Sequence, residues 1–166
     1  MADSSLRTRV VGVNVAAAED PTMYNGYLTR ARLLAPSIVN VEALENFYDS
    51  VYFLLYAATA AGTSGELGGR KLRDGMFRLL EGEPHKIGPA EIPTILDILT
   101  RDPQSSISFQ ATMGAPLFDL DTGARIVPGS IYCVREDQTF AYDVLRHNRQ
   151  TGALYGTFPC FDFRFD

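Results

Sequence analysis

The order in which two hydrophobic periodicities follow one another limits the fold of this chain more than any other feature. Residues 7–15 are rich in β-branched side chains and predict a single strand. Apolar residues at helical spacing then predict four helices, and after residues 101–103 the period changes from about 3.6 to about 2. Because an isolated strand leaves its backbone groups unpaired, either the late strands return to pair with residues 7–15, or its partners belong to another chain or a lost segment.

The predicted helices have recognisable beginnings and ends. The first begins with Asp20 as N-cap and Pro21 at the first helical position, and it closes at Pro36. The second, residues 41–58, is almost entirely apolar in its second half and stops at Gly62. We expect this helix to be sandwiched rather than exposed. The other two helices are predicted at residues 72–80 and 92–99.

Alternating patterns and turn residues predict about six strands in the C-terminal part. The segment that begins at Asp119 starts like a calcium-binding loop, but its twelfth position is Ser130 instead of a bidentate glutamate, so we interpret residues 121–123 as a hairpin turn. Further turns are predicted at residues 136–137 and 148–152. The predicted strands are residues 106–110, 116–119, 124–127, 131–135, 140–146 and 153–158.

Composition and charge exclude several classes of protein. The chain has 166 residues, of which 46% are apolar and 21% charged, as in a globular protein of one domain. The net charge is −5, and no basic run exceeds Arg70-Lys71, so we expect no nucleic-acid partner. No apolar stretch reaches the roughly 18–20 residues of a membrane span, and the first residues contain no secretory signal. Cys133 and Cys160 form either one disulfide or two free thiols.

The sequence contains no constellation typical of catalysis or metal binding. Neither His85 nor His147 has a second ligand at metal-binding spacing, and Ser64 stands in a segment one residue too short for a nucleophile elbow. We therefore expect no catalytic residue, no metal and no cofactor. Five tyrosines place hydroxyl groups on the first two predicted helices, which indicates either a half-wet cleft or interface, or a core with satisfied hydroxyls. They are Tyr24, Tyr27, Tyr48, Tyr52 and Tyr56.

Several short motifs follow one another in a recognisable order. Residues 48–57 begin Tyr-Asp-Ser-Val-Tyr, residues 72–76 read Leu-Arg-Asp-Gly-Met, and residues 114–119 read Gly-Ala-Pro-Leu-Phe-Asp. Residues 131–134, Ile-Tyr-Cys-Val, complete the series. In this order the segments resemble the C-terminal part of the type I periplasmic binding proteins, in particular the branched-chain amino acid receptors of ABC transporters.

The resemblance implies an α/β fold with partial periplasmic-binding-protein-like lobes, in which helices are followed by a β meander. Residues 1–166 would form a single C-terminal portion of a two-lobe protein. Residues 10–35 and 131–166 would belong to lobe two, and residues 47–130 to lobe one.

The implied function is that of an extracytoplasmic solute-binding component of an ABC transporter, or of a fragment of it, which closes two lobes around an amino acid or similar small polar ligand without chemistry. Asp20, Tyr24 and Tyr48 are the polar and aromatic positions nearest to where the lobes would meet, and we take them as ligand-binding candidates. The implied partners are the membrane subunits of the transporter and a missing N-terminal half. Within a longer precursor, the location would be the periplasm or a cell-surface lipoprotein.

The alternative interpretation is a stand-alone interaction module that forms a homodimer. In that case a second copy of the chain would cover the apolar residues 51–61 and the edges of the predicted sheet.

Overall fold

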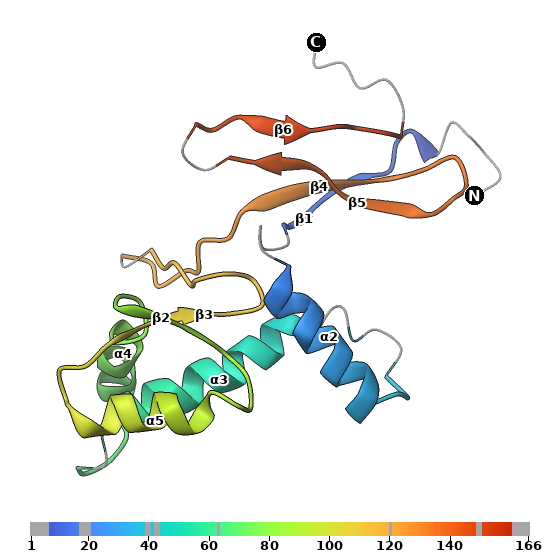
Figure 1. Cartoon of the computed structure of the whole chain (residues 1–166). Coiled ribbons are helices and arrows are strands. Elements are labelled where there is room, and N and C mark those ends of the chain that lie inside the picture. The colour runs from blue at the N-terminus through green and yellow to red at the C-terminus, as the bar shows by residue number, and fades with distance from the viewer. Residues whose placement is uncertain are drawn as a thin grey trace. The chain divides into compact units, whose positions relative to one another are not determined.

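The computed structural model describes residues 7–16, 21–38, 41, 44–62, 64–119, 121–148 and 151–160 (Figure 1). The fold is mixed α/β, as predicted, and the chain packs into two units. Unit 1 comprises Met1–Ala17 and Ile126–Asp166, and unit 2 comprises Ala18–Arg125. The chain therefore passes from unit 1 into unit 2 and back again. The first predicted helix lies in unit 2, whereas the resemblance grouped residues 10–35 with the late strands.

Unit 1 is built on a four-stranded antiparallel sheet in the order β1-β4-β5-β6. Its strands are β1 (Val11–Val15), β4 (Gly129–Val134), β5 (Phe140–His147) and β6 (Leu154–Gly156). The first strand of the chain thus finds its partner in β4, so the prediction that the late strands return to it is confirmed. Gly12 lies opposite Tyr132, whose ring fills the space that a Cβ at position 12 would need.

Unit 2 contains the helices and a small parallel sheet (Figure 1). Its elements are α2 (Thr22–Leu34), α3 (Glu45–Ala60), α4 (Gly69–Phe77), β2 (Glu83–Lys86), α5 (Ile92–Arg101) and β3 (Ile107–Gln110). The strands β2 and β3 pair in parallel, with α5 as the crossover between them. We did not predict β2, which contains His85.

The predicted helix ends are largely confirmed. Helix α2 ends at Leu34, before Pro36, and Gly62 follows α3 with a φ of 78°, a conformation that glycine adopts without strain. The predicted N-cap of α2 is corrected in part: Pro21 occupies the cap position, and Asp20 lies outside the described residues.

The predicted hairpin around residues 121–123 is correct at its turn and wrong in its strands. Asp119 Oδ1 accepts hydrogen bonds from the N–H groups of Asp121 and Thr122, at 2.9 and 3.2 Å. These bonds hold the pKa of Asp119 below its ordinary value. In place of two strands, the flanking segments form an isolated bridge between Phe118 and Arg125.

The core of unit 2 forms where α3 packs against α4, α5 and β3. Phe53, Tyr56 and Ala57 of α3 are buried in it, together with residues of the other elements. Gly75 of α4 is needed for this packing, because a Cβ there would lie 2.1 Å from the carbonyl oxygen of Ala57. The other core residues are Ala60, Leu79, Ile87, Ile95, Leu99, Ile107, Phe109 and Ala111.

A second face of α3 is uncovered. Phe47 is 70% exposed, Val51 66% and Leu54 52%. The expectation of a sandwiched helix is therefore correct for the face that carries Tyr56 and wrong for this one. No helix among the described residues is both long and apolar enough to cross a membrane.

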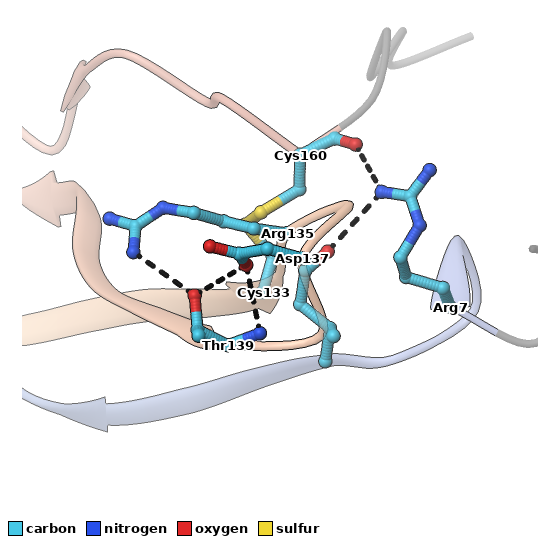
Figure 2. The surroundings of a disulfide bond; sticks show 7 residues. Arg7, Cys133, Arg135, Asp137, Thr139 and Cys160 are labelled. Atoms are coloured by element: carbon cyan, nitrogen blue, oxygen red, sulfur yellow. Dashed lines mark hydrogen bonds between the residues drawn. A yellow bond between two sulfur atoms is a disulfide. The ribbon is translucent and has the colours of Figure 1, made fainter. Parts of the chain in front are cut away.

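A disulfide joins Cys133 of β4 to Cys160, so of the two alternatives for the cysteines the bridged one is observed. Both residues are buried, in a small core with Ala141 and Val144. Figure 2 shows that the side chain of Arg7 points towards the disulfide. Its Nη1 donates a 2.7 Å hydrogen bond to the carbonyl oxygen of Cys160. The N-terminal segment, β4 and the C-terminal segment are thereby held together.

We expect reduction of this disulfide to destabilise unit 1. The bridge closes a loop with a sequence separation of 27 residues, and for such a loop the loss of the cross-link lowers the free energy of unfolding by about 3.5 kcal/mol. Urea denaturation with and without a reductant measures the change. A Cys133→Ala/Cys160→Ala variant is the control and should show the lower stability whether or not reductant is present. Equal stability of the oxidised and reduced wild type would contradict the prediction.

Candidate functional site

The structure brings together two of the three ligand-binding candidates, but inside a packed row of rings. Tyr24 of α2 lies 6.3 Å from Tyr27, and Tyr27 lies 4.9 Å from Tyr48 of α3, measured between ring centroids. Tyr52 and Tyr56 continue the row at 4.9 and 6.0 Å. We call these five residues the tyrosine row. The third candidate, Asp20, lies outside the described residues.

Hydroxyl groups of the tyrosine row are engaged within the protein. Tyr27 donates a 2.5 Å hydrogen bond to the carbonyl oxygen of Val41, and Tyr48 accepts one of 2.8 Å from Arg30. The Tyr56 hydroxyl is buried without a hydrogen-bond partner among the described residues, and burial raises the pKa of Tyr56 to about 12. For Tyr27 and Tyr48, the structure therefore supports the interpretation as core residues with satisfied hydroxyls.

Unit 2 also contains a cavity of about 350 Å³. This volume is near the lower end of the range for small-molecule sites, roughly 300–1,000 Å³. Most of the wall is apolar, and its polar groups are one carboxylate, one hydroxyl and one guanidinium. The residues that line the cavity are Asp49, Ser50, Phe53, Leu54, Met76, Phe109, Pro116, Phe118 and Arg125.

Helix α3 forms one side of this cavity. Asp49 and Phe53 are four residues apart and therefore lie on one side of the helix. The Phe53 ring packs edge-on against Phe109 of β3 at 5.2 Å and lies 5.7 Å from the ring of Phe118. These three rings give the cavity an aromatic wall that comes from three separate parts of unit 2.

Asp49 fixes the segment after β3 to α3. Its side chain is buried, with 3% exposure. Oδ1 accepts hydrogen bonds from the backbone N–H and the hydroxyl of Thr112, at 3.0 and 2.8 Å, and Oδ2 accepts one from the N–H of Met113 at 3.4 Å. Burial raises the pKa of Asp49, while the Thr112 hydrogen bonds and the positive charge of Arg125 act against this rise.

Arg125 supplies the positive charge of the cavity wall. Its guanidinium makes no hydrogen bond to another described residue, and its electrostatic partner is Asp49. The hydroxyl of Ser50 donates to the carbonyl oxygen of Asn46 at 2.7 Å. The guanidinium is therefore the hydrogen-bond donor in the wall that is left for a ligand.

The cavity was not found from the sequence. We selected Tyr48 and passed over its neighbour Asp49, although Asp49 is the only charged residue of α3 after Glu45. A single carboxylate in a helix that is predicted to be buried is a signal, because a buried charge needs a partner. No comparable local signal exists for Arg125, which reaches the cavity only through the fold.

Neither a protein-family model, nor a curated protein, nor a solved structure matches this chain. Among the described residues, no group of three or more histidine, cysteine, aspartate and glutamate side chains is placed to hold a metal ion.

We expect the burial of Asp49 to make folding depend on pH. Because its pKa is higher in the folded chain than in the unfolded chain, its contribution to stability is fully present below the ordinary carboxyl pKa of about 4. That contribution is lost as the pH rises through the raised pKa. Urea denaturation at increasing pH, starting near pH 4, should show a smaller fall in the free energy of unfolding for Asp49→Asn than for the wild type. As a control, the variant Asp74→Asn changes an exposed carboxylate and should lose as much stability with rising pH as the wild type. Identical pH profiles for all three proteins would show that Asp49 does not cause the pH dependence.

Proposed function

We propose that this chain is a solute-binding component of an ABC transporter outside the cytosol, or a part of one. It binds an amino acid or a similar small polar molecule and performs no chemistry on it. The observation that carries this proposal is the cavity of unit 2. Its aromatic and aliphatic wall suits an apolar body, and Asp49 and Arg125 place a carboxyl group and a guanidinium beside it.

One further feature supports the proposal. The Cys133–Cys160 disulfide favours an oxidising compartment, such as the periplasm or the cell surface, because cytosolic proteins rarely keep disulfides. The membrane subunits of a transporter would then be its partners.

We expect the chain to bind leucine weakly, with a Kd that is roughly millimolar or higher. The reason is that this chain resembles only the C-terminal portion of the family, whereas the main contacts to the amino acid in those proteins come from their N-terminal half. A heteronuclear NMR titration of the full chain should shift the amide signals of Phe53, Phe109 and Phe118, which line the cavity.

Two variants and calorimetry make this titration decisive. Arg125→Gln should abolish the shifts, and Arg70→Gln, which changes an exposed arginine outside the cavity, should leave them unchanged. Micromolar binding of leucine by calorimetry would contradict the expectation that half of the site lies elsewhere. If no candidate ligand shifts the cavity signals, the proposed function is wrong.

A homodimeric interaction module is the second candidate function. The uncovered face of α3 favours it, because Phe47, Val51 and Leu54 are all more than half exposed there. An apolar face of this kind is stabilised when another surface covers it, and a second copy of the chain offers the same face.

If a dimer forms, the melting temperature should rise with protein concentration. Val51→Lys should remove this dependence, because it places a charge in the apolar face. Asn46→Lys adds the same charge at an exposed polar position of α3 and should preserve the dependence. A wild type that is monomeric in sedimentation experiments at every accessible concentration would contradict the dimer.

A further inference from the structure

The polar groups of the cavity are not equally available to a ligand. Both oxygens of Asp49 already accept hydrogen bonds, from the backbone and hydroxyl of Thr112 and from the backbone of Met113. The Ser50 hydroxyl donates its proton within α3. The guanidinium of Arg125 makes no hydrogen bond to another described residue, although it lines the same cavity.

This asymmetry decides which charge on a ligand the cavity can hold. A cation meets only the one acceptor position that Oδ2 of Asp49 has left, on a group that already interacts with the positive charge of Arg125. A carboxylate shares the positive charge of Arg125 with Asp49 but displaces no hydrogen bond between described residues, and a guanidinium offers it paired N–H donors in the geometry that a carboxylate accepts. The rest of the wall, including Met76 and Phe118, is apolar and suits a hydrocarbon body.

We propose that the cavity binds a small monocarboxylate with a branched aliphatic or aromatic body, that Arg125 holds the carboxylate, and that the ligand needs no ammonium group. This inference rests on the proposed function, because it takes the cavity of unit 2 as the solute site. It goes further by assigning recognition to a single charge on the ligand. Amino acids then bind through their carboxylate and side chain, and the corresponding acids without the amino group bind as well.

Three related probes test this assignment on the unmodified full chain. Leucine carries both charged groups, isocaproate is leucine without its ammonium group, and isoamylamine is leucine without its carboxylate. In an NMR titration that follows the amides of Phe53, Phe109 and Phe118, isocaproate should bind within about threefold of leucine, while isoamylamine should cause no shift.

Variants at Arg125 test the residue itself. Arg125→Gln should weaken isocaproate binding by about tenfold or more, and Arg125→Lys should weaken it less because the charge is retained. Arg70→Gln is the control for the loss of an exposed arginine and should bind isocaproate like the wild type. The comparison of the three probes needs no variant, so it stands even if a change at Arg125 prevents folding.

The outcomes separate this inference from the proposed function. If leucine shifts the cavity signals and isocaproate does not, the ammonium group is required, and the inference fails while the proposed function stands. Binding of isoamylamine as tight as that of isocaproate also overturns the inference. If none of the probes shifts the cavity signals, both the inference and the choice of this cavity as the solute site fail.

Discussion

A buried carboxylate holds unit 2 in the form that creates its cavity. Asp49 places a carboxyl group at a position with 3% exposure, where an unpaired charge would be strongly unfavourable. Its hydrogen bonds to Thr112 and Met113 offset that cost and fix the chain just after β3 to the side of α3. The following residues carry Pro116, Phe118 and Arg125 to the cavity, so this attachment helps to position that part of the wall.

The two units are stabilised in different ways. Unit 2 buries a continuous core of aromatic and aliphatic side chains between its helices and β3. The core under the sheet of unit 1 is much smaller and centres on Cys133, Ala141, Val144 and Cys160. A small core contributes little hydrophobic stabilisation, and small domains commonly compensate with covalent cross-links. The disulfide and the hydrogen bond from Arg7 to the Cys160 carbonyl have this role in unit 1.

Sequence patterns predicted the elements that local chemistry determines. The helix stops at Pro36 and Gly62 follow from backbone restrictions of those residues, and the structure confirms both. Strand β2 could not be predicted in this way, because Glu-Pro-His-Lys contains no β-branched residue and no alternation. It is a strand because α5 returns the chain so that β3 lies beside it, which is a tertiary effect that overrides local propensity. The strands that we predicted on either side of residues 121–123 show the reverse. The local turn forms as predicted, but the flanking residues make only an isolated bridge and no pair of strands.

The candidate site shows the same limit, within a single helix. Helical spacing puts Tyr48, Tyr52 and Tyr56 in one line, so the tyrosine row was predictable in outline. Asp49 and Phe53, which directly follow Tyr48 and Tyr52 in sequence, lie on another side of the helix and line the cavity. Val51 belongs to an uncovered face. Periodicity separates these three strips of α3, but it cannot assign their roles, because each role depends on what the rest of the chain places opposite. For the strip with Asp49, what lies opposite is Thr112 and Arg125, more than sixty residues away in sequence.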